Sequence, residues 1–301
     1  MNFSASVIIP TYNGANKIKN LLKSLTQQSL KNFEVIVVID GSTDSTLEVV
    51  RCFDGAFSNL KVLSQENGGR SVVRNRGAKE AAASVLIFYD DDMIPARDSI
   101  QKHCEFNNSC MGLVCGDQAE IYDPKNSDIQ NYKIGLTKKW TDKYKEGLNR
   151  MDLQNLFFSA SNCSVKKELF FRLGGFDERL TDAEDFDFAF RAIENNIDVY
   201  YDKSNKAVHN DFITARSYVK RQRQYVAANK KLLLIHPDRK GKVYTKANFF
   251  KRIIYWFFAS SHLIRLIDAR NILMCLPKWF RYRIYNIIIQ SLSYEYPNVP
   301  I

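Results

Sequence analysis

Apolar and polar positions alternate along the first half of the chain in a pattern that predicts strands and helices in turn. Short, continuous apolar runs that are rich in β-branched residues are typical of buried strands. Residues 18–25 instead carry apolar side chains at the i, i+3, i+4, i+7 spacing of one helix face. The expected strands are residues 6–9, 33–39, 60–63 and 85–88, and two further helices are expected, one beginning at Ser42 or Thr43 and ending near Phe53, the other from Ser71 to about Ala82.

This repetition of strand and helix predicts an α/β fold with a parallel sheet and helices on both of its faces. Ligands of such sheets gather outside the carboxyl ends of the strands. Three polar strings follow the expected strands directly, at residues 10–13, 40–42 and 90–92. Because the carboxyl ends of parallel strands meet at one edge, we expect the three strings to form one site.

The most informative of these strings is Asp90, Asp91 and Asp92, which follows an apolar strand. Three adjacent carboxylates are costly to bring together unless a positive charge lies among them. A hard divalent cation such as Mg²⁺ or Mn²⁺ takes oxygen ligands and shares them with substrate phosphates. The alternative is that the string is a solvated loop start or a helix cap.

The alternation weakens in the second half of the chain. A further strand is expected at residues 113–116 and a short one at 158–165. A short helix at residues 166–173 is ended by Gly174 and Gly175, and another helix is expected from residue 183 to 195. The polar stretch 122–150 is interpreted as an excursion or loop.

The last third of the chain is helical in pattern, basic and aromatic. Residues 216–301 hold 17 Lys and Arg against 3 Asp and Glu, within a chain whose net charge is +10. The uncharged run 253–264 has 12 residues, whereas a membrane span needs roughly 20, so no transmembrane helix is predicted. The composition favours an anionic membrane surface over nucleic acid as partner. The alternative is that helices 250–264 and 279–292 pack on the sheet domain.

Bulk properties set the remaining limits. With 301 residues the chain fits one large domain or two modest ones, and we expect a division into residues 1–215 and 216–301. Six cysteines without C-x-x-C spacing favour a reducing compartment and disfavour zinc. The first residues lack the basic start of a signal peptide, so a cytoplasmic location is expected, peripheral on the inner face of the membrane.

Several strings, taken together in order and spacing, resemble the family 2 glycosyltransferases, which are inverting enzymes of the GT-A fold. The resemblance covers roughly residues 4–210 and rests on the strings 7–13, 40–44, 67–69, 74–77, 90–92, 174–177 and 184–185. It implies a Rossmann-like mixed, mainly parallel sheet flanked by helices, here with a C-terminal helical extension. Two positions depart from the family pattern: Ile39, where an aspartate is common, and Val73, where alanine is common.

The resemblance also implies a nucleotide-diphosphate sugar donor, most often a UDP-sugar. A ring at Tyr12 can stack on a base, and Asp40 can accept a hydrogen bond from uracil; its alternative role is capping a helix. Arg74 is expected to contact base or phosphate; its alternative is a surface ion pair. The donor-binding residues implied are Pro10, Thr11, Tyr12, Asn13, Asp40, Asn67, Gly69, Arg74, Asp90 and Asp91.

By the same resemblance, Asp92 is a direct ligand of Mn²⁺ or Mg²⁺, with Asp90 and His209 as further ligands. The ion would stabilise the departing diphosphate. Asp185 resembles the general base that deprotonates the acceptor hydroxyl in an inverting reaction. The alternative is that Glu184 and Asp185 only cap a helix.

The acceptor and sugar pocket is expected at Gly175, Glu184 and Trp140, with 122–150 as a lid. The acceptor itself is expected to be a growing surface glycan or a lipid-linked one. A sugar nucleotidyltransferase is a rival, but it normally carries a basic, Gly-rich loop after the first strand, and residues 11–15 lack basic side chains. A non-enzymatic sugar-nucleotide-binding protein is the other rival.

Overall fold

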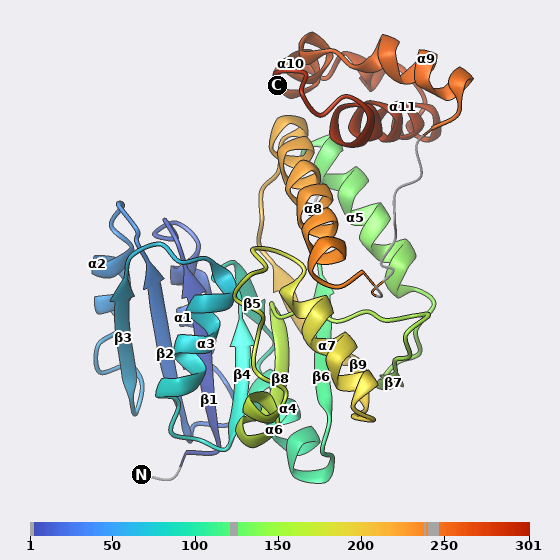
Figure 1. Cartoon of the computed structure of the whole chain (residues 1–301). Helices are drawn as coiled ribbons and strands as arrows, with labels where there is room; N and C mark the ends of the chain where they lie inside the picture. The colour runs from blue at the N-terminus through green and yellow to red at the C-terminus, as the bar shows by residue number, and fades with distance from the viewer. Residues whose placement is uncertain (1–2, 121–125, 238, 240–246) are drawn as a thin grey trace. The chain divides into compact units, whose positions relative to one another are not determined.

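A computed structural model describes residues 3–120, 126–237, 239 and 247–301 of the chain. These residues form two compact units (Figure 1). The first unit comprises residues 1–121 and 142–211, and the second comprises 122–141 and 212–301. The division at 211 lies close to the boundary expected at 215, and residues 122–141 group with the C-terminal helices.

A nine-stranded mixed sheet forms the centre of the first unit (Figure 1). Its order is β3-β2-β1-β4-β8-β6-β9-β5, and β7 pairs with β9 beyond this path. β1 to β4 run parallel, whereas β8 is antiparallel to β4 and β6. The strands are β1 (Ala5–Thr11), β2 (Phe33–Asp40), β3 (Leu60–Gln65), β4 (Val85–Tyr89), β5 (Met93–Pro95), β6 (Leu113–Ala119), β7 (Leu148–Arg150), β8 (Asn162–Lys166) and β9 (Val199–His209).

Helices cover both faces of this sheet, as the sequence pattern predicts. Side chains of successive strand residues point to opposite faces, so Ile8 packs in one core and its neighbours Val7 and Ile9 in the other. α1 (Ile18–Thr26), α2 (Thr46–Arg51) and α4 (Ser99–Ser109) contribute to the core with Val7; α3 (Arg70–Glu80), α6 (Lys167–Arg172) and α7 (Glu184–Glu194) contribute to the core with Ile8. The predicted α/β fold class is thereby confirmed.

Two helices begin later or on other residues than the sequence predicts, because the expected caps have different partners. α2 begins at Thr46, since Ser42 accepts a hydrogen bond from the Asn13 N–H and the Thr43 N–H donates to the Asn13 side chain. α3 follows Gly69, and the Ser71 hydroxyl donates to a loop carbonyl near α7. The residues expected as caps therefore form hydrogen bonds with loops distant in sequence. A local sequence pattern does not reveal such contacts.

The second unit is helical. Its helices are α5 (Asp128–Thr141), α8 (Ala215–Ile235), α9 (Phe249–Phe258), α10 (Ser261–Arg270), a 3₁₀ helix η1 (Ile272–Cys275), α11 (Lys278–Gln290) and a π-helix η2 (Ser291–Glu295). Its core combines Ile129 and Tyr132 of α5 with apolar residues of α8, α10 and α11. Within the described residues, no helix has the length and hydropathy to cross a membrane.

Of the two interpretations of 122–150, an excursion or a mobile loop, the loop is wrong for most of that stretch. Residues 128–141 form α5, and 148–150 form β7; residues 122–125 lie outside the described residues. Asp128 accepts hydrogen bonds from Arg281 at 2.5 and 2.8 Å and from the Tyr285 hydroxyl at 2.8 Å. These contacts come from residues about 150 positions later, so the polar composition of the stretch did not indicate them.

Candidate functional site

The loops after β1 and β2 lock together at the carboxyl edge of the sheet. The Asn13 N–H donates to the Ser42 hydroxyl at 2.9 Å, and the Asn13 side chain accepts from the Thr43 N–H at 2.8 Å. The Gly14 N–H donates to the Thr46 hydroxyl at 2.9 Å. Backbone groups of each loop thus bind side chains of the other, and these hydrogen bonds join the two loops at the rim of the sheet.

Residues 10–12, at the end of β1, differ in their exposure and in their contacts. Pro10 is buried within β1, whereas Tyr12 is 56% exposed. The Thr11 hydroxyl donates to Asp91 at 2.6 Å. A Cβ on Gly14 would lie 2.1 Å from the Thr11 hydroxyl and 2.4 Å from an Asp91 oxygen, so only glycine fits here. Tyr12 therefore offers an open ring, while Thr11 fixes the loop that carries the aspartates.

Asp40 organises the loop that precedes α3. Its carboxylate accepts hydrogen bonds from the N–H groups of Gly68 at 2.8 Å and Gly69 at 2.9 Å, and from the Gln65 amide at 2.9 Å. The Asn67 amide donates to the Asp40 carbonyl at 3.0 Å. Asp40, at the end of β2, thus caps α3 and not α2, the helix that follows Ser42.

Arg74 is buried at the centre of the candidate site, with 2% of its side chain exposed. One terminal nitrogen binds Asp90 and the other binds Glu184, each at 2.5 Å. Burial alone would lower the pKa of the guanidinium, but Asp90, Glu184 and Asp185 raise it. The alternative of a surface ion pair is therefore wrong. Both terminal nitrogens are engaged by protein carboxylates, which link the end of β4 to the start of α7.

Asp92 lies between two basic side chains. Lys17 Nζ is 3.3 Å from Asp92 Oδ2, and His209 Nε2 is 3.4 Å from Asp92 Oδ1. Burial opposes ionisation, but His209 and Lys17 hold the pKa of Asp92 well below its usual range. For neighbouring Asp91, by contrast, burial raises the pKa to about 7.

These residues fit a divalent cation in part. Asp92 Oδ1 is buried and, among the described residues, accepts no hydrogen bond of ordinary geometry, so it retains ligand capacity beside His209. Carboxylates suit Mn²⁺ and Mg²⁺, whereas imidazole is more typical of zinc, copper, iron and nickel sites. Asp90 is not gathered with them into a three-ligand cluster in the described part of the chain, and one of its oxygens is bound to Arg74.

Glu184 and Asp185 begin α7 after a strained residue. Ala183 has a φ of 64°, a left-handed conformation that is rare for residues other than glycine. The Asp185 carboxylate accepts a hydrogen bond from its neighbour Phe186 N–H at 2.8 Å and from the Ala160 N–H at 3.3 Å. The two acids are thus fixed at the positive end of the helix dipole.

Burial raises the pKa of both Glu184 and Asp185, and Arg74 opposes the rise. A carboxylate whose pKa lies nearer to neutrality accepts a proton more readily than an ordinary one. A simple capping role does not require this burial beside a buried arginine.

The loop at Gly175 is clamped onto α3 by Asn75. The Asn75 side chain accepts from the Phe176 N–H at 3.0 Å and donates to the Phe176 carbonyl at 2.8 Å. Gly175 has a φ of 67°, and a Cβ there would lie 2.9 Å from Asn75 Oδ1. The glycine therefore allows the loop to approach the site closely.

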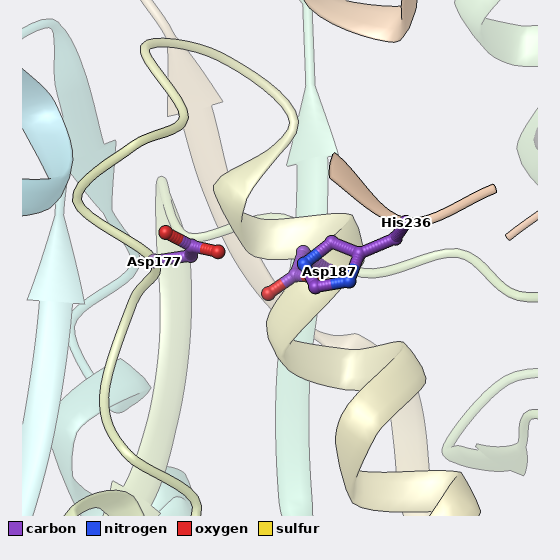
Figure 2. Close-up of side chains that lie close together, drawn as sticks. All are labelled: Asp177, Asp187 and His236. Atoms are coloured by element: carbon purple, nitrogen blue, oxygen red, sulfur yellow. The ribbon is translucent and has the colours of Figure 1, made fainter. Parts of the chain in front are cut away.

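Two further acids of the first unit hold arginines of their own segment. Figure 2 shows Asp187 on α7 and Asp177 on the preceding loop. Asp177 accepts from Arg179 at 2.6 Å, and Asp187 accepts from Arg191 at 2.8 Å. The second pair has the i, i+4 spacing of helix ion pairs.

Trp140, expected in the acceptor pocket, is 57% exposed and lies in the last turn of α5 in the second unit. Sequence reasoning missed Lys17 altogether. Its signal was present: Lys17 occupies the N-cap of α1, where Ser, Thr, Asp or Asn is preferred and a cation is disfavoured by the helix dipole. A residue that breaks a local rule is a candidate for a role in the site.

Comparison with known proteins agrees with this geometry. The sequence model described as Glycosyl transferase family 2 matches residues 6–174. An uncharacterized glycosyltransferase of Bacillus subtilis, YfnE, is 30% identical over 233 residues, which cover 62% of this chain and 59% of that protein. The O-antigen chain rhamnosyltransferase RfbN of Salmonella typhimurium is 27% identical over 220 residues, covering 72% of this chain and 69% of that one.

Solved structures share the fold at lower identity. Staphylococcus aureus TarS in complex with UDP has a TM-score of 0.55 and 22% identity, and the alignment covers 99% of this chain and 83% of that chain. The mannosyltransferase PcManGT of Pyrobaculum calidifontis, in complex with GDP-Man and Mn²⁺, has a TM-score of 0.59 and 18% identity, with coverage of 97% and 76%.

Proposed function

Because the chain belongs to glycosyl transferase family 2, we propose that it transfers one sugar from a nucleotide-diphosphate donor, a UDP-sugar, to an acceptor hydroxyl with inversion. One observation carries the proposal. Arg74 links Asp90, at the end of β4, to Glu184, beside Asp185 at the start of α7. A candidate metal ligand, Asp90, and the neighbour of a candidate base, Glu184, are thus joined through the same arginine.

The donor half of the proposal rests on the rim of the sheet. The exposed ring of Tyr12 is available to stack on the base, and Asp40 retains acceptor capacity beside the three hydrogen bonds that it receives. The fold is shared with TarS in complex with UDP and with PcManGT in complex with GDP-Man, which supports a nucleoside-diphosphate donor. Arg74, with both terminal nitrogens engaged, serves the donor indirectly by holding Asp90.

We propose that Asp92 and His209, with Asp90, hold Mn²⁺ or Mg²⁺. PcManGT, which shares the fold, is in complex with Mn²⁺. When bound, the ion neutralises negative charge on the departing diphosphate. Lys17, 3.3 Å from Asp92, brings a further positive charge to the same place.

Asp185 is the proposed base. It takes the proton of the acceptor hydroxyl as that oxygen attacks the anomeric carbon from the face opposite the diphosphate. Burial raises the pKa of Asp185, and Arg74 opposes the rise. Glu184, held by Arg74, positions this start of α7.

The test is Asp185→Asn, with Asp182→Asn, in the segment just before α7, as a matched control. UDP binding in the presence of Mn²⁺, measured by calorimetry, should survive in both variants. UDP release from a panel of UDP-sugars should fall about 100-fold or more in Asp185→Asn and stay near wild type in the control. Unchanged turnover in Asp185→Asn would disprove the assignment of the base.

The proposal extends to the acceptor and its location. RfbN is named for O-antigen chain synthesis, which supports a growing surface glycan, free or lipid-linked, as the acceptor. The basic second unit supports peripheral association on the inner face of an anionic cell membrane.

A further inference from the structure

α9 carries a continuous apolar face that points to solvent. None of the ten residues of this helix, all of them within the described part of the chain, is fully buried. Six large apolar side chains are between 47% and 76% exposed. At about 100° per residue, they lie on one arc of roughly 160°. They are, in order around the helix, Trp256, Phe249, Ile253, Phe257, Phe250 and Ile254.

The rest of the helix circumference fixes α9 to its own unit. The Tyr255 hydroxyl donates to Gln290 at 2.6 Å, and the Ser291 hydroxyl donates to the Tyr255 carbonyl at 2.5 Å. Asn248 caps the helix by accepting from the Lys251 N–H at 3.0 Å. The apolar arc is therefore the outer side of an anchored helix.

Basic residues flank this arc. By the same helix geometry, Arg252 lies beside Trp256 at one edge of the arc, and Lys251 lies beyond Ile254 at the other. Both are exposed. A hollow of about 270 Å³ at the Arg252 edge is lined by Phe249, Arg252, Ile253, Trp256 and Tyr296. An apolar stripe with cationic edges and tryptophan matches a helix that lies in a membrane interface.

The face is as large as the largest apolar patches that monomeric proteins expose. Six side chains of this size and exposure present on the order of 600 Å² of apolar area, which is at the upper limit for a monomeric protein. The charge of the second unit distinguishes between two partners for this face, a second copy of the protein and an anionic bilayer. Residues 122–141 and 212–301 hold 21 Lys and Arg against 5 Asp and Glu, so two copies meeting through this face would bring two basic surfaces together. An anionic bilayer complements the charge.

We propose that the apolar face of α9 inserts into the interfacial layer of an anionic lipid bilayer, with Lys251 and Arg252 on the lipid phosphates. The insertion would hold the enzyme where a lipid-linked acceptor is presented, a consequence that rests on the proposed function. Binding itself depends only on the second unit and is tested separately.

The experiment is flotation of the full chain with vesicles of phosphatidylcholine, alone or mixed with phosphatidylglycerol. The wild type should bind the mixed vesicles and bind the neutral ones at least about tenfold more weakly. Trp256→Ser with Phe257→Ser should lower binding to mixed vesicles by about tenfold or more. Met111→Ser with Leu148→Ser, which removes exposed apolar side chains of the first unit, should bind like wild type.

A second readout reports the inserted residue. With Trp140→Phe and Trp279→Phe, Trp256 is the single remaining tryptophan, and its emission should shift to the blue on addition of mixed vesicles. UDP binding should be unchanged in every α9 variant, so failure of vesicle binding and failure of the proposed function are separate results. Equal flotation of wild type and the α9 variant would overturn the proposal. The proposal would also be overturned if the wild type were a dimer, the α9 variant were a monomer, and the two floated equally with the vesicles.

Discussion

Replacing Arg74 by methionine removes a buried cation and leaves its two partners behind. Arg74 is 2% exposed and binds Asp90 and Glu184 at 2.5 Å each. Its guanidinium also lies 5.6 Å from the ring centroid of Phe176. Methionine keeps much of the side-chain volume, so the loss reports charge and hydrogen bonds more than packing.

The expected cost is a substantial fraction of the stability of a domain. Removing one partner of a buried ion pair costs about 3–5 kcal/mol, because the remaining charge is uncompensated. The whole free energy of unfolding of a domain is about 5–15 kcal/mol. The loss should depend on pH. Without Arg74 the folded-state pKa of Glu184 rises further above its unfolded value, so the penalty is fully present above that folded pKa and shrinks as falling pH protonates the carboxylate.

The assay is urea unfolding followed by far-UV circular dichroism, near neutral pH and again near about pH 5. Arg76→Met is the control: Arg76 is on the same helix and donates to the Ser64 carbonyl and the Gln65 side chain near the surface. It should cost less than about 1 kcal/mol. A loss in Arg74→Met below about 1 kcal/mol, or one that is equal at both pH values, would refute the reasoning.

Three further predictions follow from single side chains. Lys17→Met should tighten binding of Mn²⁺ alone, measured by calorimetry, because it removes a positive charge 3.3 Å from Asp92; weaker binding would contradict this. Burial lowers the pKa of His103 to about 4. The unfolded chain therefore binds more protons between pH 6.5 and 4, and stability should fall by about 3 kcal/mol as pH drops through this window. His103→Gln should flatten that urea-midpoint profile, and an unchanged slope would count against the assignment. Gly77→Ala should destabilise by about 1–3 kcal/mol despite alanine's better helix propensity, since its Cβ would lie 2.5 Å from an isoleucine of β1. Gly135→Ala is the control, because no atom of the described residues lies within 4 Å of a Cβ there, and it should be neutral or stabilising.

The periodicity of apolar residues determined the layered architecture and the edge of the sheet at which the polar strings meet. Period two and period 3.6 patterns depend on side chains close in sequence, so β1, β2 and β4 could be predicted directly. The order of the strings likewise indicated the family, which the match over residues 6–174 confirms.

Only the tertiary structure decided what the site residues bind. Arg74 is bound to an acid 110 positions away, Asp40 caps a helix that follows another strand, and α5 belongs with the C-terminal helices. Buried polar groups must find partners, but a one-dimensional pattern does not say which distant group satisfies them. Lys17 illustrates the same limit, since its sequence shows an unfavourable helix start and the fold alone supplies Asp92 as the reason.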